Sequence, residues 1–360
     1  MLKPRKAALT LKEYHPPLGG RIGLRLDFNE NTSGCSPRVL KALRELDVEV
    51  LAKYPEREPV ERIIADHFAL SPEQVLLTNG VDEAIHLMCQ AFVEIDDEVL
   101  IVVPTFSMYE VYASAAGARV VTVQANENFS FPLERVLSAI TPRTRLIAVA
   151  NPNNPTGAAV EEDVLLKLAA SAPQAALLVD EAYFDFHGET LVPQLRTNAP
   201  ENLFIARTFS KAYGLAGLRV GVIAGAAEPM RIVRRVSSPY NVNGVALAVL
   251  PYALADRDYI SQYVAEVREG RERMRQEFVA LGIRCWPSHA NFVLAFFGEE
   301  RQPFVRLMRN HGILVRDRNS DPGCAGCVRI TAGTREQMNV LIPALREVVN
   351  GLRAQAEMAR

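Results

Sequence analysis

The chain has 360 residues, of which 49% are hydrophobic and 23% charged, and its formal net charge is −2. A chain of this length can bury a large core, organised as one large and one smaller domain. The nearly balanced charge gives no reason to expect nucleic acid or an anionic membrane as a partner.

The sequence also lacks the signals of a secreted or membrane-spanning protein. The basic residues near the N-terminus are not followed by an apolar stretch, so a signal peptide is not expected. The most apolar segment, residues 244–255, contains Pro251 and is shorter than the roughly 20 residues that a membrane span needs. We therefore expect a cytoplasmic protein.

Five cysteines, an odd number, indicate free thiols in a reducing compartment. Cys324 and Cys327 have the spacing of a metal knuckle or a redox pair. No second pair and no histidine cluster accompanies them, and glycine and proline surround them. We therefore predict an ordinary loop here and no metal site.

The N-terminal part begins as an irregular arm of about thirty residues, interrupted by prolines and glycines, with a short strand at 24–28. Ser36-Pro37 marks the start of a helix with apolar residues on one face. A second helix is predicted over residues 60–68.

From residue 75 onward, short apolar runs alternate with segments of helical length. Continuous runs rich in valine, isoleucine and leucine are typical of strands buried on both faces of a mostly parallel sheet. The runs lie at 75–77, 99–103, 120–123, 146–150, 175–179, 203–206 and 220–224. They predict an α/β fold, with a large, doubly wound, mostly parallel domain over residues 48–250.

The C-terminal part has a different pattern. A long charged helix at 259–281 precedes strand-like and helical segments that end in a terminal helix from residue 335. We predict a smaller α+β domain over 251–360, which the arm and first helix, residues 1–47, join. The smaller domain is thus built from both ends of the chain.

Polar and aromatic residues follow five of the apolar runs. Ligands bind beyond the carboxyl ends of strands in open α/β sheets, so these residues are expected to share one site. In chain order, the segments after the runs contain Val81 and Asp82, Phe106, Asn154, Asp180 with Tyr183, and Thr208, Ser210 and Lys211. The set combines a helix start suited to phosphate, an aromatic ring, an amide, a carboxylate, a phenol and a lysine.

Each of these groups meets a need of pyridoxal 5'-phosphate chemistry. Lys211 can anchor the aldehyde covalently and then act as general base. Asp180 can pair with the ring nitrogen and keep it protonated, while Tyr183 and Asn154 lie beside the ring hydroxyl. Phe106 can stack on the ring.

The phosphate of such a cofactor needs hydrogen-bond donors and positive charge. Ser210, Thr208, Arg219 and the backbone N–H groups of Val81 and Asp82 meet this need. Each residue taken singly has an ordinary structural explanation, such as a helix cap, a turn or a surface charge. Their joint occurrence at one sheet edge favours the cofactor site over those explanations. A dinucleotide site is not indicated, because no GxGxxG motif is present.

The sequence resembles the fold-type-I, class I/II pyridoxal phosphate aminotransferases, and within them the histidinol-phosphate aminotransferases. The resemblance covers nearly the whole chain. It is carried by the motifs Phe28-Asn-Glu-Asn31, Tyr54-Pro55, Asn79-Gly-Val-Asp-Glu83, Asn154-Pro-Thr-Gly157, Asp180-Glu-Ala-Tyr183, Arg207-Thr-Phe-Ser-Lys-Ala212 with Arg219, Pro239-Tyr-Asn-Val-Asn243, Leu314-Val-Arg-Asp317 and Cys327-Val-Arg-Ile-Thr-Ala-Gly-Thr334.

The resemblance implies a homodimer with shared active sites, in which Tyr54 reaches the cofactor phosphate of the neighbouring subunit. It also implies that Arg329 binds the substrate carboxylate, that Arg316 helps to hold a substrate phosphate, and that Tyr14 lies near the substrate. Two features depart from the family pattern. Phe106 stands where many relatives have tyrosine, and residues 15–20 of the arm are unusual.

The resemblance further implies transamination between L-histidinol phosphate, the amino donor, and 2-oxoglutarate, the oxo-acid acceptor. An aromatic amino acid aminotransferase and a threonine-phosphate decarboxylase share these motifs and remain alternatives. A regulator with an aminotransferase-like sensor domain is less consistent with the sequence, because nothing before the arm is long enough for a DNA-binding helix-turn-helix.

Overall fold

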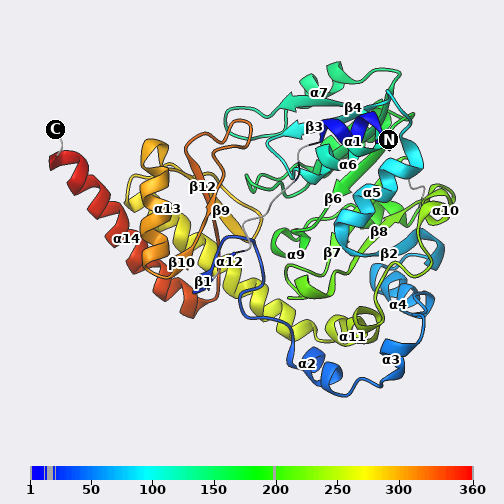
Figure 1. The fold of residues 1–360 in the computed structure, drawn as a ribbon, viewed down its shortest axis with the longest axis horizontal. Coiled ribbons are helices and arrows are strands. Elements are labelled where there is room, and N and C mark those ends of the chain that lie inside the picture. The colour runs from blue at the N-terminus through cyan, green and yellow to red at the C-terminus, as the bar shows by residue number, and fades with distance from the viewer. Residues whose placement is uncertain (1, 12, 14–18, 21, 198–199, 359–360) are drawn as a thin grey trace.

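The computed structural model describes residues 2–11, 13, 19–20, 22–197 and 200–358. Within them the strands form three sheets, the largest of which has seven strands (Figure 1). In spatial order these are β2 (Val75–Thr78), β8 (Gly221–Gly225), β7 (Leu203–Thr208), β6 (Ala176–Asp180), β5 (Thr144–Ala150), β3 (Glu98–Val103) and β4 (Arg119–Gln124).

Every apolar run that the sequence marked as a strand is part of this sheet. Strands β7, β6, β5, β3 and β4 pair in parallel, so their carboxyl ends meet at one edge. Strand β8 is antiparallel to both of its neighbours, β7 and β2. The prediction of a mostly parallel sheet in an α/β fold is confirmed.

Helices cover both faces of the seven-stranded sheet. One face packs against α4 (Glu58–Phe68), α8 (Glu162–Ser171) and α11 (Gly244–Ala255), and the other against α5 (Gly80–Phe92), α6 (Met108–Ala116) and α10 (Ala227–Val236). Alternate side chains of a strand enter the two layers, which is why these strands are apolar throughout. Short helices α7 (Leu133–Ala139) and α9 (Phe184–His187) lie in the connections.

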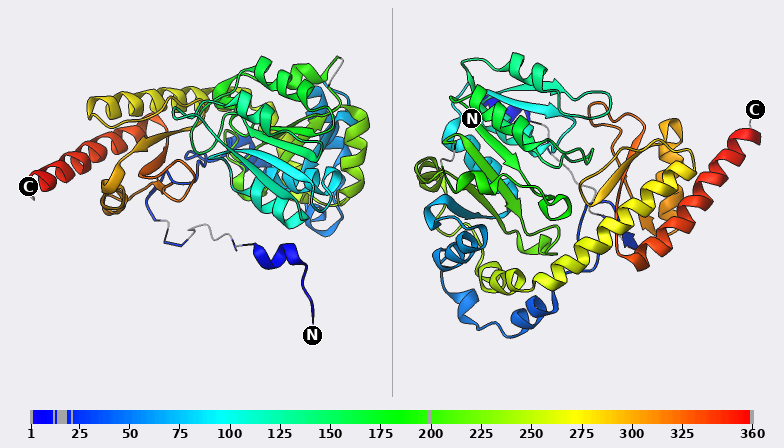
Figure 2. Two further views of the ribbon diagram at one scale, coloured as in Figure 1. Left: turned by 90° about the horizontal axis from the view of Figure 1, so that it is seen from above. Right: turned by 180° about the vertical axis from the view of Figure 1, so that it is seen from behind.

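The C-terminal part forms a separate hydrophobic core around a three-stranded antiparallel sheet. Its strands are β11 (Arg316–Asp317), β12 (Cys327–Thr331) and β9 (Phe292–Phe296). They pack with α12 (Arg257–Ala280), α13 (Arg301–Asn310) and α14 (Arg335–Met358). Helix α12 runs from the large sheet to this part, and α14 lies along it (Figure 2). We propose that the two cores correspond to the two expected domains.

The N-terminal segments belong to both parts. Strand β1 (Leu24–Arg25) pairs in parallel with β10 (Ile313–Leu314) of the C-terminal part. Helix α2 (Pro37–Arg44), which Ser36 caps, packs instead on α11, within the core of the large sheet. This packing differs from the expectation that the first helix joins the smaller domain. Helix α3 (Glu49–Ala52) follows it and also contacts α11.

The arm contains one helix that the sequence pattern did not indicate. Helix α1 (Lys6–Thr10) lies against α6, and the Arg5 guanidinium donates to the carbonyl of Ala116 at 3.3 Å. None of the described helices is long and apolar enough to cross a membrane.

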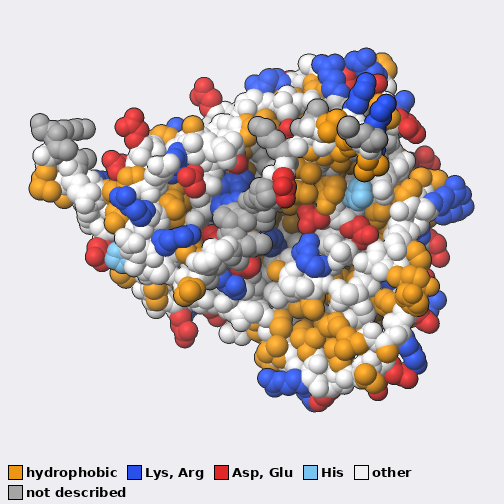
Figure 3. All heavy atoms as spheres, in the orientation of Figure 1, with side chains coloured by type: hydrophobic (Ala, Val, Ile, Leu, Met, Phe, Trp, Pro, Cys, Tyr) orange, Lys and Arg blue, Asp and Glu red, His pale blue; other side chains and the backbone are white. Residues whose placement is uncertain are grey.

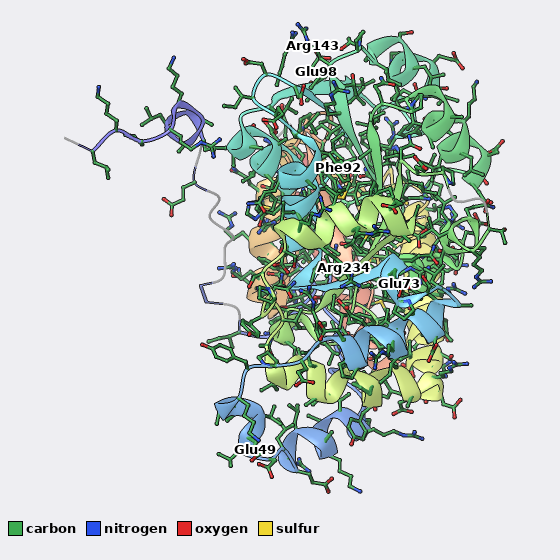
Figure 4. All side chains as sticks on the ribbon, turned by 90° about the vertical axis from the view of Figure 1, so that its right-hand side faces the viewer. Glu49, Glu73, Phe92, Glu98, Arg143 and Arg234 are labelled. Atoms are coloured by element: carbon green, nitrogen blue, oxygen red, sulfur yellow. The ribbon has the colours of Figure 1, made fainter. Side chains whose placement is uncertain are left out.

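A buried carboxylate anchors the start of β3. Glu98 is 2% exposed, accepts a hydrogen bond from Thr141 at 2.6 Å and pairs with Arg143 at 3.0 Å (Figure 4). The hydrogen bond from Thr141 lowers the pKa of Glu98 despite its burial. This pairing ties β3 to the turn before β5, the two strands whose far ends carry site residues.

Candidate active site

A cavity of about 210 Å³ lies at the carboxyl ends of the parallel strands. It is lined by residues from the connections after β2, β3, β5, β6 and β7, together with the segment after β1. The residues predicted from the strand ends that line it are Val81, Asp82, Phe106, Asn154, Asp180, Tyr183, Thr208, Ser210, Lys211 and Arg219.

The sheet topology explains this convergence. Asp180 is the last residue of β6 and Thr208 the last residue of β7, and these strands are parallel neighbours. Lys211 follows Thr208 by three residues, in the loop before β8. Because β3 and β5 point the same way, Phe106 and Asn154 are delivered to the same edge.

Asp180 is a buried carboxylate at the floor of the cavity. Its Oδ2 accepts a hydrogen bond from the Tyr109 hydroxyl at 2.6 Å, and its Oδ1 accepts from the N–H of Ala182 at 3.0 Å. Burial raises the pKa of Asp180 to about 6, while both hydrogen bonds and the nearby Lys211 act in the opposite direction. A cation that entered the cavity would therefore stabilise the ionised carboxylate.

Lys211 and Tyr183 occupy one side of the cavity. The Nζ of Lys211 donates to the carbonyl of Phe28 at 3.3 Å and lies 5.9 Å from the centre of the Tyr183 ring. The Tyr183 hydroxyl accepts a hydrogen bond from the Asn29 amide at 2.9 Å. The segment after β1 thus holds both the amine and the phenol in place.

The opposite end of the cavity has the features of a phosphate site. Helix α5 begins at Gly80, so the N–H groups of Val81 and Asp82 belong to its first turn. Gly80 has a φ of +78°, and a Cβ at this position would lie 2.6 Å from Nη2 of Arg219. The positive φ favours glycine at this position, and the absence of a side chain leaves room for the arginine at the helix start. Nη2 of Arg219 also pairs with Asp82 at 2.8 Å.

A second concentration of positive charge lies next to the cavity. Arg329 on β12 is 4% exposed and donates to the Asn154 side chain at 2.5 Å and to the Asp27 carbonyl at 2.7 Å. Its Nε has no hydrogen-bond partner among the described residues. Burial lowers the pKa of Arg329 to about 9, and the charges of Arg318 and Arg316 add to this effect.

Arg316 pairs with Arg329 across the β11–β12 ladder, so their backbones are direct neighbours. The Arg316 guanidinium lies 5.1 Å from the centre of the Phe28 ring, and Phe28 lines the cavity. Arg316 itself lines an adjoining hollow of about 490 Å³ together with Arg301 and Arg309. Among the described residues the buried Arg329 forms no ion pair with a carboxylate, and buried positive charge of this kind favours an anionic ligand.

Among the described residues, Tyr54 is the predicted cofactor-binding residue that does not line the cavity, and the predicted substrate-binding residues Arg316 and Arg329 lie beside the cavity rather than in its lining. Tyr54 is 78% exposed, and its ring stacks on Tyr240 with centroids 4.5 Å apart. It does not line the cavity of its own chain. Tyr14 lies outside the described residues.

The structure adds residues that the strand ends did not indicate. Phe28 and Glu30 line the cavity, and Asn29 contacts Tyr183. The motif at residues 28–31 was the available signal, although it lies far from the strand ends. Tyr109, the partner of Asp180, carried no such signal.

Cys324 and Cys327 are free thiols, and both are buried. Cys324 lies in a turn, as expected, whereas Cys327 is the first residue of β12. They belong to a small hydrophobic cluster with Phe129, Trp286 and Leu294. Among the described residues no group of three or more His, Cys, Asp or Glu side chains could hold a metal ion.

Comparison with known proteins places the chain in a family. The model of the family "aminotransferase class I and II" matches residues 21–345. The chain belongs to this family. It is 35% identical to the histidinol-phosphate aminotransferase of Caldanaerobacter subterraneus subsp. tengcongensis over 335 residues, which cover 91% of this chain and 93% of that protein.

Two further relatives agree with this assignment. The histidinol-phosphate aminotransferase of Moorella thermoacetica is 34% identical, with 96% of this chain and 93% of that protein covered. The crystal structure of the Sinorhizobium meliloti histidinol-phosphate aminotransferase in complex with pyridoxal-5'-phosphate superposes with a TM-score of 0.87 at 27% identity. It covers 98% of this chain and 99% of that one.

The aminotransferase is therefore a pyridoxal-phosphate-dependent transaminase, and the residues of its cavity fit that cofactor. The buried Asp180 carboxylate suits a protonated ring nitrogen, and Lys211 suits the aldehyde. The glycine-dependent approach of Arg219 to the start of α5 suits a phosphate monoester.

Proposed function

We propose that this aminotransferase transfers the amino group of L-histidinol phosphate to 2-oxoglutarate, a reaction of histidine biosynthesis. The products are imidazole acetol phosphate and L-glutamate. The donor carbon is oxidised from amine to ketone while the acceptor carbon is reduced from ketone to amine, so the exchange needs no further oxidant. The curated relatives that match along nine-tenths of the chain carry this activity in their names.

The observation that carries the proposal is the pairing of Arg316 and Arg329 beside the cavity. Histidinol phosphate presents a phosphate and no carboxylate, whereas 2-oxoglutarate presents carboxylates. Arg329, already buried and lacking a partner for Nε, would take the acceptor's carboxylate as a bidentate fork. Arg316 would help to hold the donor's phosphate.

The cofactor would be held by the residues that line the cavity. In the bound state, pyridoxal phosphate supplies an aldehyde that takes up the amino group and a ring that accepts an electron pair. Asp180 would pair with the ring nitrogen, Tyr183 and Asn154 would lie at the ring hydroxyl, and Phe106 would stack on the ring.

The phosphate of the cofactor would lie at the other end of the cavity. The donors there are the N–H groups of Val81 and Asp82, the hydroxyls of Thr208 and Ser210, and the guanidinium of Arg219. Arg219 already pairs with Asp82, so a bound phosphate would share the Arg219 guanidinium with the Asp82 carboxylate.

Lys211 would perform the proton transfer. With the cofactor bound, the Nζ of Lys211 would hold its aldehyde and, when released, would act as the general base that moves a proton. Nζ donates to the Phe28 carbonyl and Lys211 lines the cavity, so the amine is available to a ligand bound there. The same amine thus serves as anchor and as base.

We also propose a homodimer in which Tyr54 completes the partner's cofactor site. Its high exposure and its distance from the cavity of its own chain support this role. Hydrophobic side chains gather at the bottom of the view in Figure 3, where Figure 1 places α2 and α11. The large exposed ones in α2, α3 and α11 are Leu40, Leu51 and Tyr252. A surface of this kind is typical of subunit contacts.

We further propose that the enzyme acts in the cytoplasm, since all five of its cysteines are free thiols. A reducing compartment suits that state. The substrates of the reaction are small molecules, as expected for the family.

The substrate proposal is tested by half-reactions of the purified holoenzyme. Histidinol phosphate, phenylalanine, glutamate and threonine phosphate are added separately, and the loss of absorbance of the lysine-bound cofactor is followed. We expect histidinol phosphate and glutamate to react with the highest second-order rate constants. Phenylalanine as the best donor would instead indicate an aromatic aminotransferase, and carbon dioxide release from threonine phosphate a decarboxylase.

The Arg316→Ala variant sharpens this test. It should lower the rate constant for histidinol phosphate roughly 10- to 100-fold, as expected for a lost charge-assisted contact, and affect phenylalanine much less. Arg306→Ala, an exposed arginine on α13, is the matched control. Equal losses for both donors would contradict the role of Arg316.

A further inference from the structure

The only side chain seen to donate a hydrogen bond to Asp180 among the described residues is Tyr109, which stands in the second position of helix α6. Its hydroxyl lies 2.6 Å from Oδ2 of Asp180, and the tyrosine is 1% exposed. A short hydrogen bond from a neutral donor to a buried carboxylate is stronger than an ordinary one. Tyr109 is not among the residues that line the cavity.

Small side chains next to Asp180 leave room for the Tyr109 ring. Ala150 and Ala206 are its register partners on β5 and β7, so their side chains lie on the same face of the sheet. Both are small and belong to the core layer that contains Tyr109. Larger residues at either position would compete with the tyrosine for the space beside the carboxylate.

The same ring also supports the aromatic side of the cavity. Phe106 packs edge-to-face on Tyr109, with centroids 5.8 Å apart and an interplanar angle of 88°. Tyr109 therefore contacts two residues with proposed roles at the cofactor ring, Asp180 at its nitrogen and Phe106 at its face. One side chain links them behind the cavity wall.

We propose that Tyr109 is a positioning residue that orients the Asp180 carboxylate and keeps it ionised for the cofactor's ring nitrogen. The inference rests on the proposed role of Asp180. Tyr109 and the Ala182 N–H each hold one carboxylate oxygen, which fixes the plane of the group and leaves its remaining lone pairs for the ring nitrogen.

The charges around the pair are consistent with this role. Burial, together with the neighbouring carboxylate, raises the pKa of Tyr109 well above its ordinary value, so the phenol keeps its proton and remains a donor. The other ionisable groups that act on the pair are Asp82 on α5, Lys211 after β7 and Tyr183 before α9. The charge of Asp82 raises the pKa of Asp180 and so disfavours its ionised form, whereas the charge of Lys211 lowers that pKa.

The test is the Tyr109→Phe variant, which removes one oxygen and keeps the ring against Phe106. Without the hydroxyl, the carboxylate becomes a stronger base and the ring nitrogen loses part of its positive charge. We expect pyridoxal phosphate to bind the apoenzyme roughly tenfold more weakly, the loss typical of a hydrogen bond to a charged group. The pH midpoint of the lysine-bound cofactor's absorbance should shift upward, since a less positive ring favours the protonated form of its bond to lysine.

Tyr112→Phe is the matched control. Tyr112 lies one turn further along α6, is half-buried, and stacks on His86 with centroids 5.2 Å apart. The same chemical change there should leave cofactor affinity and the pH midpoint within about twofold and about 0.2 pH units of wild type, as expected for a group with no contact to the reacting ring.

A cofactor analogue separates positioning from simple packing. In 1-deazapyridoxal phosphate a CH group replaces the ring nitrogen, so no proton can be shared with Asp180. The affinity lost in Tyr109→Phe should largely disappear with this analogue. Equal losses with both cofactors would show that Tyr109 acts only by packing, and no loss with either would also overturn the proposal.

The Asp180→Asn variant distinguishes this inference from the function on which it rests. If Asp180→Asn leaves the affinity and the absorbance unchanged, the proposed role of Asp180 is wrong. If it changes both, the Tyr109→Phe substitution in the Asp180→Asn background should add little, because the carboxylate to be positioned is gone. Additive effects in this double-mutant cycle would contradict the positioning role. If the Tyr109→Phe single variant is too unstable to measure, comparison of the double variant with Asp180→Asn alone still tests the proposal, because a large effect of the hydroxyl without the carboxylate would overturn it.

Discussion

The two ends of the active site are built in different ways. At the cofactor end, Asp180, Tyr183 and Lys211 come from neighbouring parallel strands within about thirty residues of sequence. At the proposed substrate end, Arg329 of the three-stranded sheet contacts Asn154, in the loop after β5, and the backbone of Asp27. The cofactor end is thus a property of one sheet edge, whereas the substrate end depends on how distant segments meet.

The two ends also differ in how their buried charges are satisfied. Both oxygens of the Asp180 carboxylate accept hydrogen bonds from within the chain. Within the part of the chain that the structure describes, the Nε of Arg329 has no hydrogen-bond partner, and Arg316 and Arg318 add like charge near it. A hydrogen-bonded carboxylate suits the proposed pairing with the cofactor ring, whereas a buried guanidinium suits an anionic group of the substrate. In the proposed function, chemistry and specificity would therefore reside in separate parts of the site.

Replacing Lys211 should have the largest effect, because its amine is proposed to be both the anchor of the cofactor and the proton carrier. In Lys211→Ala the anchor and the proton carrier are both lost, so we expect kcat to fall by more than about 10³-fold. The absorbance of the lysine-bound cofactor should disappear. Circular dichroism and thermal unfolding should remain close to wild type, since Lys211 is only half-buried.

Lys167→Ala is the control for this variant, because Lys167 is an exposed lysine on α8 that pairs only loosely with Glu134, at 3.6 Å. Its turnover should match that of wild type. Unchanged turnover in Lys211→Ala would contradict the proposed role of the cofactor end, since no other lysine lines the cavity among the described residues.

Tyr54 tests whether part of the cofactor end is supplied by the neighbouring subunit. In the Tyr54→Phe homodimer the loss of one hydrogen bond to the cofactor phosphate should reduce activity roughly tenfold. Tyr252→Phe, another exposed tyrosine, should be near wild type.

Mixed dimers identify the subunit that Tyr54 serves. A dimer of one Tyr54→Phe and one Lys211→Ala subunit contains one site with both native residues only if Tyr54 reaches across the interface. We therefore expect about half of the wild-type activity in that dimer, measured after separation by two affinity tags. If Tyr54 acted within its own subunit, the mixed dimer would show only about half of the activity of the Tyr54→Phe homodimer, because its other site lacks Lys211.

The sequence was sufficient for the cofactor end, for a physical reason. Carboxyl ends of parallel strands must meet at one edge, so Asp180 and Lys211 could be placed together without knowledge of the fold's details. Tyr109 could not be found in this way, because its ring reaches Asp180 from a helix beside the strand and helical spacing alone only indicates burial. The antiparallel direction of β8 was also invisible, since a buried strand is apolar in either direction.

The substrate end and the packing of the N-terminal segments required the structure. The contact between Arg329 and Asn154 joins residues 175 positions apart, and no local pattern encodes it. Helix α2 is amphipathic and could have covered either core; its packing on α11 depends on tertiary contacts. Sequence patterns thus predict which faces are buried more reliably than which partner covers them.

The smallest expected effect concerns the contact between α9, which follows β6 of the large sheet, and the C-terminal part. His187 of α9 packs edge-to-face on His289 of the C-terminal part, with centroids 4.8 Å apart. The His187 side chain is 6% exposed, and its Nε2 lies 3.5 Å from Glu189. Desolvation lowers the pKa of His187, the charges of His289, Arg268 and Arg271 lower it further, and Glu189 opposes them.

A lowered pKa in the folded state means that the unfolded chain binds the proton more readily. The stability associated with neutral His187 is therefore fully present above the unfolded value of about 6.5 and is lost as the pH falls below it. We expect the urea midpoint of wild type to decrease between pH 7.5 and pH 5, and to decrease less in His187→Gln. The corresponding difference in the free energy of unfolding should be on the order of 1 kcal/mol or less, because a single histidine is involved and Glu189 partly offsets the lowering of its pKa.

His311→Gln, an exposed histidine at the end of α13, is the control and should follow the wild-type curve. If His187→Gln also followed it, acid would not act at this contact. If His187→Gln made the urea midpoint less dependent on pH while the cofactor stayed bound, acid would weaken the contact between α9 and the C-terminal part before it affects the cofactor site. We expect the contact to weaken before the cofactor is lost, because the cofactor end belongs to a single sheet whereas the substrate end depends on the contact between two cores.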